Sequence, residues 1–317
     1  MRIEEIIENT VTEIRDTTNE IDIAFSGGLD STLVARLCVD ALGSERVRLI
    51  NISFDRYSYT RSASIVRRVA EDIGLQLFIE REMQLQEEIW RRGPSCNRCT
   101  RHAKINTIRK LSDRLIATGA NQSDSWGKTG IAIKDGFYAP IRSWDKHQIS
   151  EALRHYGIVV PKIGESAGRE GCKLKHLLKM LINPDFHGKA VDMSNEILLD
   201  FLNNRESDIA NVKIIGPLSR NIALVNVRPY LKTEEIREVT GRLSELSVID
   251  EVHYMDSPVS LTVAANPAVT NDPESMRWIE EGRLQPEFAV PIKVDWLPSR
   301  NRRLDTFHVV DFRRGAM

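Results

Sequence analysis

The N-terminal third of the chain alternates between short apolar runs and longer amphipathic stretches. The short runs, rich in β-branched residues, predict strands at 21–25, 46–54, 75–79 and 116–119. Stretches with apolar residues three or four positions apart predict helices at 3–17, 29–42, 59–73, 83–90 and 105–115. Strands that alternate with helices form a parallel sheet with right-handed crossovers. We therefore expect an α/β fold with a Rossmann-like parallel sheet and helices on both of its faces.

The pattern changes in the last third of the chain. It predicts helices at 195–202, 233–246 and 273–282 and strands at 220–227, 249–255 and 259–265. We expect a domain at 1–190 followed by a smaller α+β domain at 191–317. Edge strands in the smaller domain would present unpaired backbone groups that favour pairing between chains, so we expect a homo-oligomer.

The junction between the first strand and its helix reads Ser26-Gly27-Gly28-Leu29-Asp30-Ser31. Such a turn directs backbone N–H groups at whatever lies above the helix N-terminus, and the helix dipole favours an anion there. Gly27 and Gly28 lack the side chains that would keep a phosphate away from the backbone. Ser26 and Ser31 add hydroxyl donors, and Asp30 is suited to hold a Mg²⁺ ion that bridges phosphate oxygens. The loop predicts a phosphate site, and an ordinary strand-to-helix turn is the alternative.

Other strand ends are expected beside this loop, because ligands of parallel sheets bind beyond the carboxyl ends of the strands. The second strand ends near Ser53–Asp55, and the fourth leads into Gly119–Asp124. We predict an adenine site at Ser53 and Phe54, where backbone groups would read the base edge and the Phe54 ring would cover one face. The alternative is the ordinary end of a buried strand.

Composition limits the partners and the compartment. The 317 residues carry a net charge of −1, which by itself predicts no nucleic-acid partner. Residues 101–190, however, hold 16 Lys and Arg against 8 Asp and Glu, with five of the seven His. We find no signal peptide and no apolar run of membrane-spanning length, so we expect a cytoplasmic protein without a membrane partner. In that compartment the four cysteines are expected as thiols or metal ligands rather than disulfides.

Three cysteines are candidates for chemistry. Cys96 and Cys99 form a Cys-x2-Cys pair and Cys172 follows later, whereas Cys38 lies on the apolar stripe of the helix after the loop and is expected in the core. One interpretation is a structural Zn²⁺ site completed by His176, which is otherwise a surface residue of a basic helix. A second is a disulfide-forming pair or a thiol that carries sulfur directly. A third is an iron–sulfur cluster with three protein ligands, whose open iron would bind an exogenous sulfide.

The loop Ser26–Ser31 resembles the pyrophosphate loop, or PP-loop, of the N-type ATP pyrophosphatases. That superfamily includes GMP synthetase, NAD synthetase, tRNA thiolation enzymes and sacrificial sulfur transferases. The resemblance implies that ATP is split into AMP and pyrophosphate while a substrate oxygen is adenylated. It is not a Walker loop, which has a Lys before its Ser/Thr.

Two further segments resemble the same enzymes. In residues 119–124, Gly119 and Asp124 match the family loop after the fourth strand, while Ala120 replaces a His and Ser123 an Asp. The resemblance implies a Mg²⁺-side or nucleotide-side carboxylate at Asp124, and a turn residue is the alternative. Residues 138–142, with Lys146 and Ile149, resemble the family's Pro-Leu segment and the helix start that follows it. Arg142 is accordingly expected to face phosphate, or else to be a solvated surface residue.

The spacing of Cys96, Cys99 and Cys172 is similar to that of the cluster-dependent tRNA thiolases. The resemblance implies a [4Fe–4S] cluster on these residues, with Zn²⁺ as the alternative. We expect an ATP-dependent sulfurtransferase in which cluster-bound sulfide displaces AMP from an adenylated acceptor, a tRNA base. The alternatives are a small-molecule acceptor, as in the sacrificial transferases, an amide-forming ligase with structural zinc, and a non-catalytic nucleotide sensor. The sulfur donor does not follow from the sequence.

Overall fold

The computed structural model describes residues 2–92, 95–161, 172–179, 182–203, 205–301, 304 and 307–315. The chain forms two compact units, each assembled from separate stretches. Unit 1 comprises Met1–Phe54, Ser62–Glu82 and Thr100–Pro161, and unit 2 comprises Asp55–Arg61, Met83–Cys99 and Lys162–Met317. The division into domains at 1–190 and 191–317 stays a prediction.

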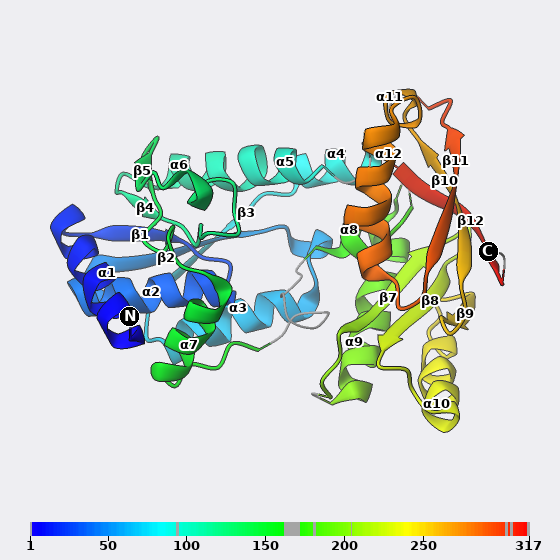
Figure 1. Ribbon diagram of the computed structural model, residues 1–317, viewed down its shortest axis with the longest axis horizontal. Coiled ribbons are helices and arrows are strands. Elements are labelled where there is room, and N and C mark those ends of the chain that lie inside the picture. Colours follow the sequence, from blue (N-terminus) through cyan, green and yellow to red (C-terminus); the bar gives the residue numbers. More distant parts are fainter. Residues whose placement is uncertain are drawn as a thin grey trace. The chain divides into compact units, whose positions relative to one another are not determined.

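A six-stranded sheet forms the centre of unit 1 (Figure 1). Its strands are β1 (Ile21–Ala24), β2 (Val47–Ser53), β3 (Leu77–Arg81), β4 (Ile116–Ala117), β5 (Ile133–Lys134) and β6 (Phe137–Tyr138). They lie in the order β3-β2-β1-β4-β6-β5, and every pair is parallel except β5 with β6. The predicted α/β fold with a Rossmann-like parallel sheet is confirmed.

Helices flank this sheet, and each of them buries apolar side chains. They are α1 (Ile3–Thr17), α2 (Leu29–Leu42), α3 (Thr60–Asp72), α6 (Asn106–Leu111) and α7 (Lys146–His155). Along α1 the buried residues recur at the helical spacing of Ile3, Ile7 and Ile14. Cys38 on α2 is completely buried, as predicted, and burial raises the pKa of its thiol to about 12.

Unit 2 contains two three-stranded sheets. One has the order β7 (Ile209–Ile215), β8 (Ile222–Arg228), β9 (Glu251–Tyr254), and the other β11 (Ile292–Pro298), β10 (Val259–Ala265), β12 (Phe307–Arg314). The helices are α4 (Gln84–Arg92), α5 (Cys96–Arg98), α8 (Lys173–His176), α9 (Lys189–Leu202), α10 (Thr233–Ser244), α11 (Pro267–Thr270) and α12 (Pro273–Ile279). The strands predicted at 220–227, 249–255 and 259–265 are present, but the third lies in a different sheet from the first two.

Short 3₁₀ and π segments complete the secondary structure. The 3₁₀ segments are η1 (Ser44–Arg46), η2 (Asp55–Tyr57), η4 (Gly127–Thr129) and η7 (Gln285–Glu287). The π-helices are η3 (Cys99–Ile105), η5 (Pro184–Gly188) and η6 (Glu280–Leu284).

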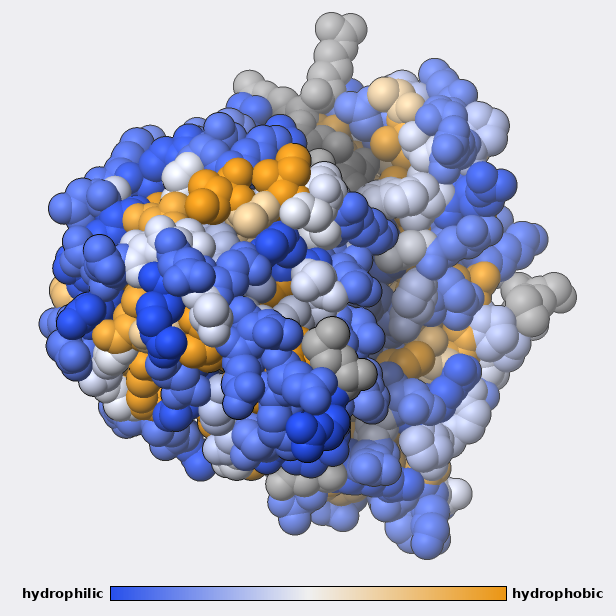
Figure 2. Space-filling model, turned by 60° about the vertical axis from the view of Figure 1, so that its left-hand side comes forward, coloured by the Kyte–Doolittle hydropathy of each residue, from blue (hydrophilic) through white to orange (hydrophobic). Residues whose placement is uncertain are grey.

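The surface is predominantly hydrophilic, with apolar side chains gathered in separate patches (Figure 2). In unit 1 the most exposed large apolar side chains are Phe78, Leu111, Ile131, Ile133 and Val159. Within the residues that the structure describes, every helix is too short or too polar to cross a bilayer. The predicted homo-oligomer stays a prediction.

Candidate functional site

The PP-loop Ser26–Ser31 lies where the sequence places it in unit 1, where it connects β1 to α2 and includes the first three residues of that helix (Figure 1). Phe25 still follows the sheet, since its N–H donates to the Ile50 carbonyl over 2.9 Å. Gly28 is the N-cap of α2, and its carbonyl accepts the first helical bond from the Thr32 N–H. The N–H groups of the first helical turn therefore point out of the helix end, where an anion can bind them.

Two constraints require glycine at position 27. Its φ of +64° lies in the left-handed region, which L side chains rarely adopt. A Cβ atom on this residue would lie only 3.0 Å from the Val66 Cα and 3.1 Å from the Val66 Cγ2 on α3. The loop is therefore pressed against the neighbouring helix, and its path depends on the missing side chain.

The two loop serines brace the turn. The Ser31 Oγ donates to the Gly28 carbonyl over 3.2 Å and lies 3.2 Å from the Ser26 Oγ. The Ser31 Oγ also accepts the Ser26 N–H over 3.3 Å. Ser31 is buried and Ser26 is exposed, so the Ser26 hydroxyl is the one placed at the open side of the loop.

Asp30 has a cationic partner that the sequence analysis did not include among the site residues. The Lys146 Nζ lies 2.9 Å and 2.7 Å from the two Asp30 carboxylate oxygens. Lys146 opens α7, so this helix presents an ammonium group at the first turn of α2. A cation here is suited to bind phosphate oxygens together with the loop N–H groups, and Asp30 is suited to hold Mg²⁺.

Gly119 packs directly on the PP-loop helix, as predicted from the shared sheet edge. A Cβ on Gly119 would lie 2.8 Å from the Asp30 Cβ and 3.2 Å from the Ser31 backbone nitrogen. The loop that follows is ordered by the fully buried Asn121, whose side chain binds the Gly119 carbonyl and the Ser123 N–H and hydroxyl. The backbone that follows the fourth strand thus lies against the first turn of α2.

Asp124 is exposed, and one of its carboxylate oxygens accepts the Asn121 N–H over 3.0 Å. This contact is that of a turn residue, the alternative that the sequence left open. The Mg²⁺ role predicted for Asp124 stays a prediction.

The predicted adenine site lies at the end of β2. The Ser53 carbonyl accepts the Glu82 N–H over 3.0 Å, so this group continues the β2–β3 ladder. The Phe54 ring is buried, and the Lys104 ammonium lies 5.6 Å from its centroid. In the same strand Asn51, a polar residue in an apolar run, donates to the Phe25 carbonyl over 2.7 Å and fixes the start of the PP-loop. The adenine role of Ser53 and Phe54 stays a prediction.

Arg142 is held by Glu13 of α1. Its guanidinium contacts both Glu13 carboxylate oxygens, at 2.6 Å and 3.2 Å, and its Nε donates to the Gly130 carbonyl. The bond to Glu13 raises the pKa of Arg142. Burial, with Glu13 nearby, raises the pKa of Tyr138, whose hydroxyl donates to the same carboxylate. The phosphate-facing role predicted for Arg142 stays a prediction, and the observed contacts are those of a structural ion pair.

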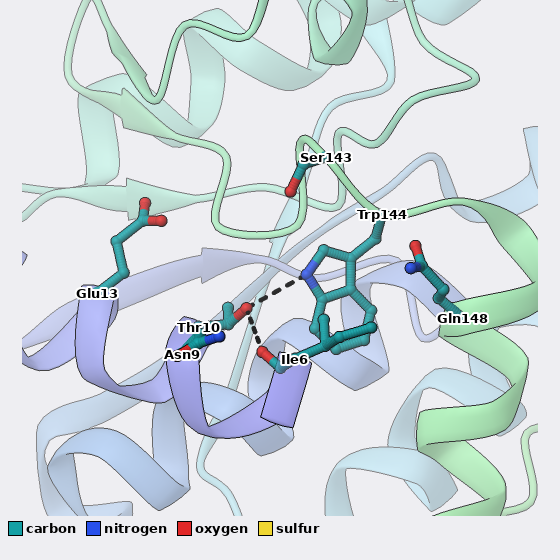
Figure 3. A pocket seen from close by; sticks show the side chains of 7 residues that line it. All are labelled: Ile6, Asn9, Thr10, Glu13, Ser143, Trp144 and Gln148. Carbon is teal, nitrogen blue, oxygen red and sulfur yellow. Dashed lines mark hydrogen bonds between the residues drawn. The ribbon is translucent and has the colours of Figure 1, made fainter. Parts of the chain in front are cut away.

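A pocket of about 320 Å³ lies beside the segment that carries Lys146 (Figure 3). The Trp144 indole N–H donates to the Thr10 hydroxyl over 3.2 Å, and that hydroxyl donates to the Ile6 carbonyl. Gln122 reaches the other side of this segment, because its N–H donates to the Trp144 carbonyl. Residues 143–146 are thereby fixed between α1 and the loop 119–124, which orients Lys146 toward Asp30.

The cysteines predicted as ligands belong to unit 2. All four cysteines of the chain are thiols, and Cys96 and Cys172 are exposed whereas Cys99 is half-buried. Cys172 forms an isolated β-bridge with Ser58. Among the described residues, no three His, Cys, Asp or Glu side chains are grouped so as to hold a metal ion. The Cys96, Cys99 and Cys172 set is therefore not assembled in the structure.

His176 does not complete a zinc set either. It is fully buried rather than at the surface, so the surface alternative was wrong. Its Nδ1 lies 2.7 Å from the Tyr59 hydroxyl, and its Nε2 lies 3.6 Å from a Glu287 carboxylate oxygen. Both ring nitrogens thus face buried polar groups of unit 2.

The parallel sheet of unit 1, with its glycine loop at the start of α2, resembles the nucleotide-binding domains of the PP-loop ATP pyrophosphatases. Residues 1–94 match the family model described as NAD synthase. Comparison with curated proteins gives no match. The family match indicates an ATP-using enzyme of the PP-loop type.

Proposed function

We propose that this chain is an ATP-dependent sulfurtransferase that forms AMP and pyrophosphate. The observation that carries the ATP-dependent step is the PP-loop with Lys146 placed on Asp30. An acceptor oxygen attacks the α-phosphorus of ATP and pyrophosphate leaves. The N–H groups at the start of α2 and the Lys146 ammonium balance the charge on the leaving group. Asp30 would hold Mg²⁺, which supplies further charge neutralisation at the phosphates.

The second step exchanges the activated oxygen for sulfur. A sulfur nucleophile attacks the carbon that bears the adenylate, the carbon–oxygen bond breaks, and AMP leaves. The Cys-x2-Cys pair supports this step, because thiolates are the protein's strongest sulfur nucleophiles and sulfur carriers. Sulfur delivery through a [4Fe–4S] cluster requires Cys96, Cys99 and Cys172 at one place. The described residues do not group these three thiols, so the proposed transfer uses no cluster.

A tRNA base is our proposed acceptor. The helical stretch after Cys99 exposes the basic side chains of Arg101, Lys104, Arg109 and Lys110. Lys and Arg at this density suit a phosphate backbone, and their binding weakens steeply with salt. A small-molecule acceptor, as used by sacrificial transferases, would show no such salt dependence at these residues.

The test combines pyrophosphate release with analysis of the product. Anaerobically purified protein is incubated with ATP, Mg²⁺, sulfide and unfractionated tRNA, and thiolated tRNA is detected by its retardation in an organomercury gel. We expect pyrophosphate release that depends on tRNA, together with a retarded tRNA band. Pyrophosphate release without thiolated product would refute sulfur transfer to tRNA. Iron and acid-labile sulfide measured on the same preparation decide whether a cluster is present.

Two observations favour a second candidate, an adenylating ligase that forms an amide. The family model matched by residues 1–94 is that of NAD synthase, and the set of thiols needed for a cluster is not assembled. The test replaces sulfide and tRNA with ammonia and the carboxylic-acid precursor of NAD. Formation of the amide would show that the chain is a ligase and would refute the sulfurtransferase proposal. Structural zinc, part of this alternative in the sequence analysis, lacks His176 as a fourth ligand because that ring faces Tyr59 and Glu287.

A further inference from the structure

The Cys-x2-Cys pair stands at the start of a helix. Cys96 is the first residue of α5 and is exposed. Cys99 follows three residues later, is half-buried, and begins the π-helix η3. Its N–H donates to the Ser95 carbonyl over 2.9 Å, so both cysteines belong to the same helical turn. π-Helical turns are rare and occur frequently at functional sites.

The spacing brings the two thiols within reach of one bond. Residues three apart in a helix have Cβ atoms about 5–6 Å apart. A disulfide needs a Cβ–Cβ distance of about 3.5–4.5 Å. Closing the bond therefore requires a shift of about 1–2 Å, and the first residue of a helix can make it because no intrahelical bond holds its N–H.

Side chains of α4 hold Cys99 and the residue before it. The buried Gln86 of α4 donates its amide N–H to the Cys99 Sγ over 2.9 Å. Arg98 lies between the two cysteines in the sequence, and its guanidinium forms an ion pair with Glu88 of α4 at 2.5 Å. These contacts anchor the second half of the turn on α4. They leave Cys96 as the exposed, adjustable member of the pair and Cys99 as the fixed one.

We propose that Cys96 and Cys99 form a redox-active dithiol that a low-molecular-mass disulfide converts to an internal disulfide. The Cys96 thiolate attacks one sulfur of the oxidant, whose S–S bond breaks, and the first thiol leaves. Cys99 then attacks the Cys96 sulfur of this mixed disulfide, and the second thiol leaves. Two protons are released from the cysteines and taken up by the leaving thiolates, so that one disulfide is reduced as another forms.

Disulfide formation uses the same pair of cysteines as the proposed sulfur transfer, but it needs neither ATP nor an acceptor and can be measured separately. The exposure of Cys96 makes the bond readily reduced, as in disulfides that act as switches rather than as structural links. Cys38 cannot take part in the exchange, because it is completely buried in unit 1 and its pKa is raised to about 12. Cys172, exposed like Cys96, is the matched competitor for the oxidant.

The test is titration of the reduced full-length chain with oxidised glutathione, read by intact mass and peptide mapping. We expect wild type to lose two hydrogens and to yield a Cys96–Cys99 linked peptide. Cys99→Ser is expected to stop at a mixed disulfide, with one glutathione retained on Cys96. Cys172→Ser is the control and should close the bond as wild type does. Gln86→Leu should close it several-fold more slowly, because Cys99 is then no longer held.

Two outcomes would overturn the proposal. One is a wild-type protein that accumulates mixed disulfides with glutathione on Cys96 without closing. The other is a bond that joins either cysteine to Cys172. The mass readout requires no turnover, so failure of the sulfurtransferase assay and failure of this titration are separate results.

Discussion

Gly27→Ala tests whether the PP-loop requires both its backbone conformation and its contact with α3. The substitution adds one methyl group to a residue with a φ of +64°. That methyl group would meet the backbone Cα of Val66 at 3.0 Å, which a change of side-chain rotamer cannot relieve. Either the loop or α3 must therefore move. If the loop moves, the N–H groups that face the phosphate move with it.

The magnitude has two parts. The left-handed conformation costs a non-glycine residue about 1–2 kcal/mol. Overpacking a well-filled site typically costs a further 1–3 kcal/mol or so. We therefore expect Gly27→Ala to lower the free energy of unfolding by about 2–5 kcal/mol.

Gly74→Ala is the matched control. Gly74 has a φ of +68°, but a Cβ there would meet nothing within 4 Å. It should show the conformational part alone, about 1–2 kcal/mol. The difference between the two variants in urea unfolding isolates the crowding against Val66. Titration calorimetry with a non-hydrolysable ATP analogue should show binding weakened at least about tenfold in Gly27→Ala, or about 1.4 kcal/mol, and little changed in Gly74→Ala. Equal stability of the two variants, with equal affinity for the analogue, would refute the reasoning.

Three more substitutions test other parts of the structure. Lys146→Ala should reduce pyrophosphate release about tenfold or more. Its free energy of unfolding in urea should stay within about 1 kcal/mol of wild type, because the ion pair with Asp30 is partly exposed. Substitution of the exposed Lys134 by Ala is the control, and unchanged release in Lys146→Ala would exclude a role of Lys146 at the phosphates. Arg142→Ala should lower the free energy of unfolding by about 1–3 kcal/mol, because Glu13 loses its ion-pair partner, and should leave the affinity for ATP unchanged. Weaker ATP binding at unchanged stability would instead place Arg142 at the phosphate. Burial lowers the pKa of Lys179 from 10.5 to about 8. At pH values between these two, the Lys179 side chain is therefore protonated in the unfolded chain and neutral in the folded chain. Wild type should therefore gain stability relative to Lys179→Met as pH rises from about 8 to 10, by up to roughly 3 kcal/mol, and parallel pH profiles of the two proteins in urea unfolding would contradict this.

The features that sequence predicted correctly depend on short-range interactions. The PP-loop, its strand and its helix span residues 21–42, and their hydrophobic periods and glycines determine the local path. The placement of residues 26–31 and 119–124 at one edge of the sheet also followed from the sequence, because parallel topology brings the strand ends together there. Such predictions need only the period of each segment and the handedness of its connections.

The contacts that sequence did not reveal depend on side chains distant along the chain. Lys146 meets Asp30, and Arg142 meets Glu13, across more than a hundred residues. A Lys at the start of a helix is compatible with many surroundings, so only the fold can select its partner. In β7, which the sequence analysis missed, Lys213 is fully buried against Glu287 and interrupts the apolar run. A charged residue in an apolar run is read from sequence as a surface position. A strand that contains one member of a buried ion pair is therefore missed by its hydrophobic pattern.

The cysteines show that chemistry which depends on contacts between distant residues is also hard to predict from sequence. The link between Cys96 and Cys99 is local, because any helical turn there brings the two thiols together. The link to Cys172 is long-range, and nothing in the sequence positions the third thiol apart from the resemblance of spacing. The structure places Cys96 and Cys99 in one helical turn and does not group them with Cys172. Two-thiol chemistry therefore rests on the geometry of unit 2, whereas cluster chemistry needs a rearrangement that brings Cys172 to the pair. Iron and sulfide analysis tests that rearrangement directly, since a protein that binds a [4Fe–4S] cluster through these cysteines must bring all three together.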